Sequence, residues 1–222
     1  NELFMKKKTK IAIVVAIIVI AIVLVAVYFA TNTKKENNSG TENNTNNTTN
    51  STSTATASTP LEELEKYNKI EDGTYTTYTT TDGVSFMYPS KWVKVGTDEA
   101  PAFMGADGKG ASVNYATDTI GGDDTIVQDF DTYISFQKLY LVQKMTMLSD
   151  IDENIVNLNG RKAYILNYDT ESEQDGKTIQ LHVTQVAFED NGSVKILTMA
   201  VLKDSYSSVQ TIFDKITKSF TK

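Results

Sequence analysis

Cysteine is absent from this chain of 222 residues. Without a thiol the protein has no disulfide bond, no cysteine nucleophile and no zinc site built on thiolates. The same absence excludes an anchor in which a lipid is attached to a cysteine. Any folded part of the chain must therefore be stabilised by its hydrophobic core alone.

Histidine is almost as scarce, since His182 is the only one. It falls within residues 178–188, a run in which positions 179, 181, 183, 185 and 187 share one face of a strand and the even positions share the other. A histidine without a second histidine, a cysteine or a serine nucleophile motif lacks the partners that hydrolytic or metal chemistry needs. We therefore interpret His182 as structural and expect no catalytic residues and no enzyme activity.

Positive charge is scarce beyond residue 60. Residues 61–222 hold 25 Asp and Glu against 15 Lys and Arg. A domain with this acidic excess repels phosphate backbones and anionic lipid headgroups, so we expect no nucleic acid among its partners. At 162 residues it is long enough to bury roughly 70% of its unfolded surface, which makes folding without disulfides feasible.

What the chain does have is one long apolar run, residues 11–30, without a charge, a proline or a glycine. As a helix rising about 1.5 Å per residue it would be ~30 Å long, the thickness of the hydrocarbon core of a bilayer. We expect a single transmembrane helix. Four lysines precede it within residues 1–10, whereas only Lys34 and Lys35 follow it closely. This asymmetry predicts a basic cytoplasmic N-terminus.

A cleaved signal peptide is the alternative to such a signal anchor. Signal peptides have an apolar region of roughly 7–15 residues and small residues before the cut. The run here is longer, and the bulky Tyr28 lies three positions before any cut after Ala30. We expect an uncleaved anchor in the cell membrane with an extracytoplasmic C-terminal domain, and cleavage stays open as the alternative.

High use of Asn, Lys, Ile and Thr fits a bacterial source with AT-rich DNA.

Residues 31–60 are rich in Asn, Thr and Ser and contain no aromatic residue and no aliphatic residue larger than alanine. Such a segment cannot offset the entropy of ordering its backbone, so we expect a disordered linker. Acceptor patterns for glycosylation at Asn43, Asn46 and Asn50 leave a glycosylated stalk open as the alternative. The chain thus divides into residues 1–10, 11–30, 31–60 and a folded domain at 61–222.

The first half of the domain reads mainly as strands. Residues 61–70 are a short amphipathic stretch that we expect to cap the domain edge. Strand formers at 74–81 and an alternating run at 84–88 flank Asp82-Gly83, a hairpin turn signal. Residues 102–104 and 111–116 form a second expected pair around a glycine-rich turn. A helix should follow, capped by Asp129 or Asp131, with its apolar residues at Phe130, Tyr133, Ile134, Leu141, Met145 and Leu148.

The second half repeats the pattern. Strands are expected at residues 154–158, 161–168, 178–188 and 194–202, with Asn-Gly turns at 159–160 and 191–192. A last helix is expected with Asp204 as its cap and an apolar face of Tyr206, Val209, Ile212, Phe213, Ile216 and Phe220. Strands, helix, strands, helix predicts an α+β fold, in which an antiparallel β-sheet is flanked by helices.

Two stretches of the domain resemble the PsbP-like family. Its opening strand is similar to residues 84–92, VSFMYPSKW, and its closing helix is similar to residues 212–220, IFDKITKSF. The resemblance covers about residues 79–221. It implies an α/β/α sandwich used mainly as a docking module, without catalytic residues common to the group. We accordingly expect a membrane-anchored domain that binds an envelope or membrane protein.

Candidate binding residues follow from these expectations. Trp92 is a large apolar residue that should close one end of the core, and it joins three tyrosines as an expected partner-binding patch, namely Trp92, Tyr88, Tyr75 and Tyr78. The alternative function is sensing or carrying a small ligand or calcium. Four carboxylates before Gly176 form the candidate calcium site, namely Asp169, Glu171, Glu173 and Asp175. No other cofactor is expected.

Overall fold

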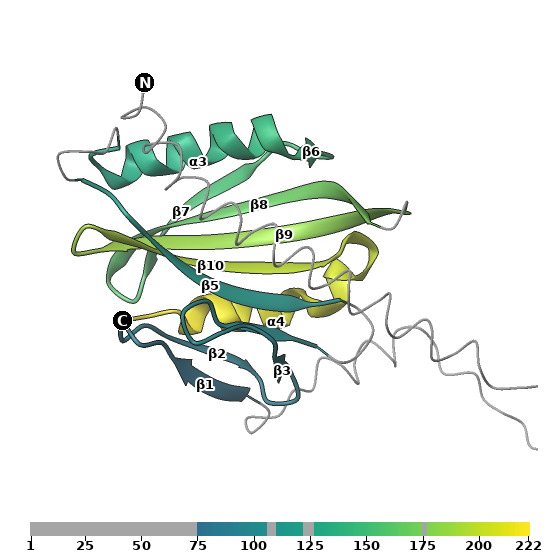
Figure 1. Cartoon of the computed structure of the whole chain (residues 1–222), viewed down its shortest axis with the longest axis horizontal. Helices are drawn as coiled ribbons and strands as arrows, with labels where there is room; N and C mark the ends of the chain where they lie inside the picture. The colour runs from purple at the N-terminus through teal and green to yellow at the C-terminus, as the bar shows by residue number, and fades with distance from the viewer. Residues whose placement is uncertain (1–74, 106–109, 122–126, 175–176) are drawn as a thin grey trace, which may run out of the picture.

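The computed structural model describes residues 75–105, 110–121, 127–174 and 177–222 (Figure 1). The expected cytoplasmic segment, transmembrane helix, linker and amphipathic stretch at residues 1–70 lie outside these ranges. Within them, no helix is both long enough and apolar enough to cross a bilayer.

Strands dominate the described part of the chain. In order, its elements are β1 (Tyr75–Thr79), β2 (Ser85–Pro89), β3 (Val93–Lys94), β4 (Ala102–Met104), β5 (Ser112–Thr119), α3 (Phe130–Lys144), β6 (Thr146–Met147), β7 (Asp152–Leu158), β8 (Arg161–Gln174), β9 (Lys177–Asp190), β10 (Ser193–Leu202), the 3-10 turn η1 (Lys203–Ser205) and α4 (Tyr206–Ser219).

One antiparallel sheet of eight strands organises the domain. Its order is β3-β4-β5-β10-β9-β8-β6, and β7 pairs with β8 beside β6. The strands β1 and β2 form a separate antiparallel hairpin, with the predicted Asp82-Gly83 turn between them and Gly83 at a φ of 83°. The predicted α+β fold with an antiparallel sheet is therefore confirmed.

The two Asn-Gly turns fix the long hairpins of the sheet. Asn159 and Gly160 have φ angles of 52° and 85°, and Asn191 and Gly192 have 51° and 73°. Positive φ at both central residues is the turn geometry whose twist matches that of paired strands, and Asn and Gly adopt it at low cost. The predicted strand pairs on either side are confirmed, although β8 and β9 run on to 14 residues each.

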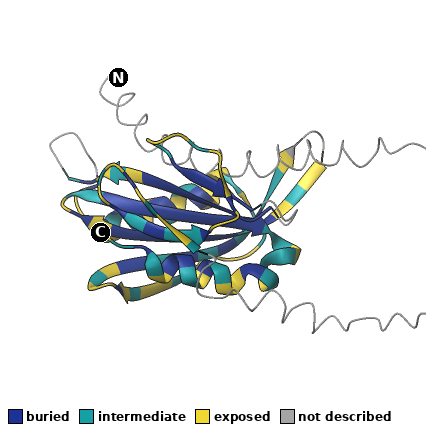
Figure 2. Ribbon diagram, turned by 90° about the horizontal axis from the view of Figure 1, so that it is seen from below, coloured by how far each residue is buried: buried dark blue, intermediate teal, exposed yellow. Residues whose placement is uncertain are grey.

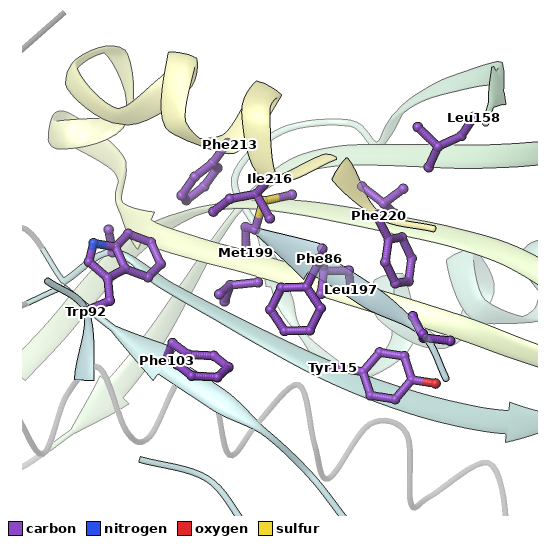
Figure 3. Packing of buried hydrophobic residues seen from close by; sticks show 14 of the residues in the cluster. Phe86, Trp92, Phe103, Tyr115, Leu158, Leu197, Met199, Phe213, Ile216 and Phe220 are labelled. Carbon is purple, nitrogen blue, oxygen red and sulfur yellow. The ribbon is translucent and has the colours of Figure 1, made fainter. Parts of the chain in front are cut away.

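The sheet is the middle layer of a sandwich with α3 on one face and α4 with the β1-β2 hairpin on the other (Figure 1). The upper core lies under α3, and its members include Phe130, Tyr133, Ile134, Leu141, Leu166, Tyr168, Leu181 and Ile196. The lower core lies against α4 (Figure 3), and its members include Phe86, Trp92, Phe103, Leu197, Met199, Phe213, Ile216 and Phe220.

Alternation along the central strands supplies both cores. On β10, Ile196 belongs to the upper core and Leu197 to the lower core. On β9, Leu181 and Val183 belong to the upper core and Val186 and Phe188 to the lower core, as the predicted faces of this strand require. Strand β10 is consequently buried along almost its whole length, and β9 is mostly buried from Leu181 to Phe188 (Figure 2).

Two helix boundaries differ from the prediction. Asp204 does not cap α4, because it lies inside η1, and Ser205 occupies the cap position without a side-chain hydrogen bond. The helix α3 ends at Lys144 rather than near Leu148. The backbone of Met145 turns extended there, and the next two residues form β6, which pairs with β8.

Candidate functional site

The helix α3 is fixed on the sheet by its cap and by ion pairs along one side. Asp129 Oδ1 accepts a hydrogen bond from the backbone N–H of Thr132 at 2.8 Å. Of the two caps that the sequence allowed, Asp129 and Asp131, the N-cap of α3 is therefore Asp129. Lys162 Nζ on β8 donates to Asp131 at 2.7 Å. Lys138 on α3 pairs with Glu153 on β7. Because the buried residues of α3, such as Ile134 and Leu141, pack in the upper core, the opposite face of the helix points to solvent.

Three large apolar side chains lie on that solvent face. Phe136, Leu139 and Val142 are 40%, 52% and 59% exposed. They follow one another at intervals of three residues, which places them in one row along the helix. We call Phe136, Leu139 and Val142 the outer row. A surface helix of a globular domain normally carries polar residues opposite its core face, so this row is the strongest candidate binding surface in the described part of the chain.

Sequence reasoning missed the outer row because it looked for one apolar face and found it in the residues of the upper core. The available signal was the apolar residues left over. They recur at the same helical spacing but fall on the opposite side, so α3 is apolar on two faces. An exposed apolar row of this kind is a candidate interaction surface.

The tyrosines predicted to bind a partner are placed apart from the outer row. Tyr88 stacks on Phe103 at a ring distance of 3.9 Å, and Tyr78 meets the same ring edge-on at 5.1 Å. Tyr75 lies under Lys215 of α4, at 4.3 Å. All three are half-buried, so much of their surface holds the β1-β2 hairpin on the domain. Their role in binding stays a prediction.

Trp92 is only 9% exposed and belongs to the lower core (Figure 3). The expectation that it closes one end of the core agrees with this position. Its indole offers little surface for a partner to contact, and its share in partner binding stays a prediction.

The predicted calcium ligands are only partly brought together. Asp169 Oδ1 lies 2.8 Å from His182 Nδ1, and its Oδ2 lies 3.1 Å from Lys203 Nζ. Glu171 and Glu173 follow on β8, opposite Gln180 and Thr178 of β9. Asp175 lies outside the described residues. Among those described, no three Asp, Glu or His side chains gather closely enough to hold a metal ion.

Electrostatics around Asp169 favour an ion pair. Partial burial alone would raise the pKa of its carboxyl group, but the hydrogen bonds from His182 and Lys203 outweigh that effect and lower the pKa below its ordinary value. The carboxylate of Asp169 is thus already bound by the side chains of His182 and Lys203.

His182 is packed as a structural residue. Its ring stacks on Tyr206 at 3.5 Å, which holds the start of α4 against β9. Its Nε2 atom is buried and has no hydrogen-bond partner among the described residues. A histidine and aspartate pair acts in hydrolysis only when that nitrogen faces a nucleophile. The structural interpretation of His182 is consistent with its stacking on Tyr206 and stays a prediction.

An open cavity of about 370 Å³ lies at the N-terminal end of α3. Charged side chains of both signs line it, and both of the lining cations are engaged in ion pairs. Arg161 donates to Asp190 at 2.9 Å and Lys162 pairs with Asp131. The cavity therefore presents no strong field of one sign to a ligand.

Comparison with known proteins agrees with this architecture. The family model PsbP matches residues 73–222. No curated protein matches the chain. Among solved structures, the chain is similar to cyanobacterial PsbP (CyanoP) from Synechocystis sp. PCC 6803, with 17% identity, a TM-score of 0.49 and coverage of 69% of this chain and 95% of that one.

Two further structures resemble the domain. PA94 from Pseudomonas aeruginosa, a protein of unknown function, has 18% identity, a TM-score of 0.47 and coverage of 68% of this chain and 98% of its own. LpqN from Mycobacterium tuberculosis, involved in cell envelope biogenesis, has 15% identity, a TM-score of 0.42 and coverage of 74% and 96%.

Proposed function

The chain belongs to the PsbP family, and from this premise we propose that it is a membrane-anchored docking protein. Its domain at residues 61–222 lies outside the cytoplasm, has no catalytic activity and binds a protein of the membrane or envelope. The outer row of α3 is the observation that carries this proposal, because three large apolar side chains in one row are poorly suited to permanent contact with water.

The chemistry of the outer row suits a protein partner. Phe136 is an aromatic anchor of the kind that dominates binding energy in interfaces, and its aliphatic neighbours add apolar area. The row runs obliquely along α3, as residues three apart do, and such a ridge can pack against the apolar face of another helix. Because the domain is acidic, it is a poor partner for nucleic acid.

The chain outside the described domain supports the location. The apolar run at residues 11–30 has the length of a membrane span, and 44 residues separate it from β1. As a flexible coil, the expected linker at residues 31–60 would have an r.m.s. reach of about 30 Å and would hold the domain close to the membrane. The described part of the domain begins at β1, on the side of the sandwich opposite α3 (Figure 1).

Site-specific photocrosslinking in native membranes tests the docking function. A photoreactive amino acid replaces Leu139 in the full-length chain, and the matched control carries it at Gln210, an exposed position on α4. We expect one nearly stoichiometric crosslinked protein from position 139 and none from position 210. Identical products from both positions, or none from either, would contradict docking through α3.

A further inference from the structure

We propose that the free edge of β7 binds an extended segment of a partner protein, which adds to the sheet as a further antiparallel strand. This inference rests on the docking function proposed above and adds to it a second contact, separate from the outer row. Among the described strands β7 pairs with β8 alone, and it lies at the edge of the sheet next to α3 (Figure 1). The backbone groups on its outer side have no partner strand, and a second extended chain can pair with them.

The register of the β7-β8 hairpin shows which backbone groups face outward. Leu158 and Arg161 flank the two-residue Asn-Gly turn, which closes with hydrogen bonds between them. Hydrogen-bonded and non-hydrogen-bonded pairs alternate along an antiparallel ladder. Every second residue before Leu158 therefore bonds to β8, whereas the N–H and C=O groups of Glu153, Ile155 and Asn157 point to the free edge.

The strand β7 lacks the features that normally keep a sheet edge from pairing. It is seven residues long, contains no proline and no lysine, and pairs with β8 residue for residue without a bulge. Glu153, a charge in its first half, is already paired with Lys138 of α3. The opposite edge of the sheet is the two-residue strand β3, which carries Lys94. Of these two edges, β7 is the one suited to strand addition.

Side chains along β7 define the segment that it binds. Ile155, at the middle of the strand, is 57% exposed, and an apolar β-branched residue directly opposite would pack against it. Asp152 points to the other face of the strand, because it lies three residues earlier, and it is exposed. A basic residue on that face complements its charge. The partner segment should therefore alternate apolar β-branched residues with lysine or arginine.

Two versions of one peptide test strand addition. The probe is a heptapeptide of alternating lysine and isoleucine with a fluorophore at its N-terminus. In an antiparallel pair, the isoleucine opposite Ile155 directs its N–H toward β7, and the N–H groups of the lysines point away. One version carries N-methyl groups on the backbone nitrogens of the lysines, and the matched control carries them on the isoleucines. The two versions share every side chain and differ only in which backbone edge can donate.

Fluorescence anisotropy with the full-length chain in detergent micelles measures the binding. The peptide methylated at lysine should bind saturably. The peptide methylated at isoleucine should bind about tenfold more weakly or not at all, because it lacks the N–H groups that face β7. Equal affinities, or no binding of either peptide, would overturn the inference.

A change at Ile155 locates the contact on β7. Ile155→Pro removes an outward N–H that pairing with β8 does not use, a position at which an edge strand tolerates proline. This variant should lose the peptide methylated at lysine, whereas Ile155→Val keeps the N–H and a branched side chain and should retain it. Binding that survives Ile155→Pro would place the contact elsewhere and overturn the inference. The two peptides need no change in the protein, so they decide the question even where the proline variant is less stable.

The outcomes separate strand addition from docking through α3. If neither peptide binds while photocrosslinking at position 139 captures a protein, strand addition is wrong and docking through α3 stands. If the peptide methylated at lysine binds selectively while position 139 yields no product, strand addition stands and docking through α3 is wrong.

Discussion

At the scale of single residues, one ion pair ties the turn of the β1-β2 hairpin to the sheet. Lys195 of β10 is 5% exposed, and its Nζ donates to Asp82 Oδ2 at 2.6 Å. The hydroxyl of Tyr115 donates to the same oxygen at 2.6 Å. Partial burial alone would raise the pKa of Asp82, but the hydrogen bonds from Lys195, Thr80 and Tyr115 lower it from 3.8 to about 2.

This lowered pKa predicts a pH-dependent contribution to stability. A carboxyl group whose folded pKa is depressed stabilises the fold above its unfolded pKa and loses that contribution as the pH falls from about 4 to about 2. Because the side chain of Asp82 is 31% exposed, we expect Asp82→Asn to cost only about 1 kcal/mol near neutral pH.

Urea unfolding followed by the fluorescence of Trp92, the only tryptophan, measures the effect. The difference in unfolding free energy between wild type and Asp82→Asn should be present at about pH 6 and nearly absent at about pH 2. The same difference at both pH values would contradict the ion pair as its source.

This pair also shows where sequence reasoning stops. Asp82 is recognisable as a turn residue because glycine follows it, and that prediction is confirmed. Its cation lies 113 residues further along the chain. Local propensity carries no information on such a contact, since only the pairing of β5 with β10 brings Tyr115 and Lys195 to the same place.

At the scale of elements, the edge of the sheet depends on a close backbone approach at Gly96. A Cβ atom there would lie 2.2 Å from the carbonyl oxygen of Ala100 and 2.5 Å from the backbone nitrogen of Ala102. Backbone atoms cannot rotate away, so Gly96→Ala should separate β3 from β4 and cost about 2 kcal/mol or more. We expect a red shift of Trp92 fluorescence, because Trp92 lies directly before β3.

Gly160→Ala provides the comparison for this change. Gly160 has a φ of 85° and open space around the new methyl group, so the substitution strains only its own backbone, by about 1–2 kcal/mol. It should leave the emission of Trp92 unchanged. Equal red shifts in the two variants would show that the crowding at Gly96 has no local effect.

Elements were predictable wherever one local signal was decisive. The two Asn-Gly turns set both long hairpins, and alternation assigned the faces of β9. The cap of α4 was not predictable. The side chain of Asp204 is of the type that caps helices, but the residue lies inside the 3-10 turn η1. The outer row was missed for a different reason. Exposure depends on which helix face the sheet covers, and periodicity alone does not decide that when two faces are apolar.

At the scale of the whole molecule, one sheet shared by two cores predicts a single cooperative unit. Ile196 and Leu197 are neighbours on β10, yet one packs under α3 and the other against α4. Both are almost fully buried, so Ile196→Ala and Leu197→Ala should each cost about 2–5 kcal/mol.

Trp92 lies in the lower core and makes this prediction specific. Ile196→Ala alters only the upper core, yet we expect the unfolding midpoint from Trp92 fluorescence to fall together with the midpoint from far-UV circular dichroism. An unchanged fluorescence midpoint beside a lowered dichroism midpoint would mean that the two layers unfold separately.

The absence of cysteine makes the orientation of the whole chain in the membrane testable. With no native cysteine, a membrane-impermeant maleimide reports only the cysteine that is introduced. In cells with an intact plasma membrane it should label Gln210→Cys in the domain but label Thr9→Cys, among the N-terminal lysines, only after lysis. Reversed labelling would place the domain in the cytoplasm. Labelled domain released from the membrane fraction would instead indicate cleavage after the apolar run.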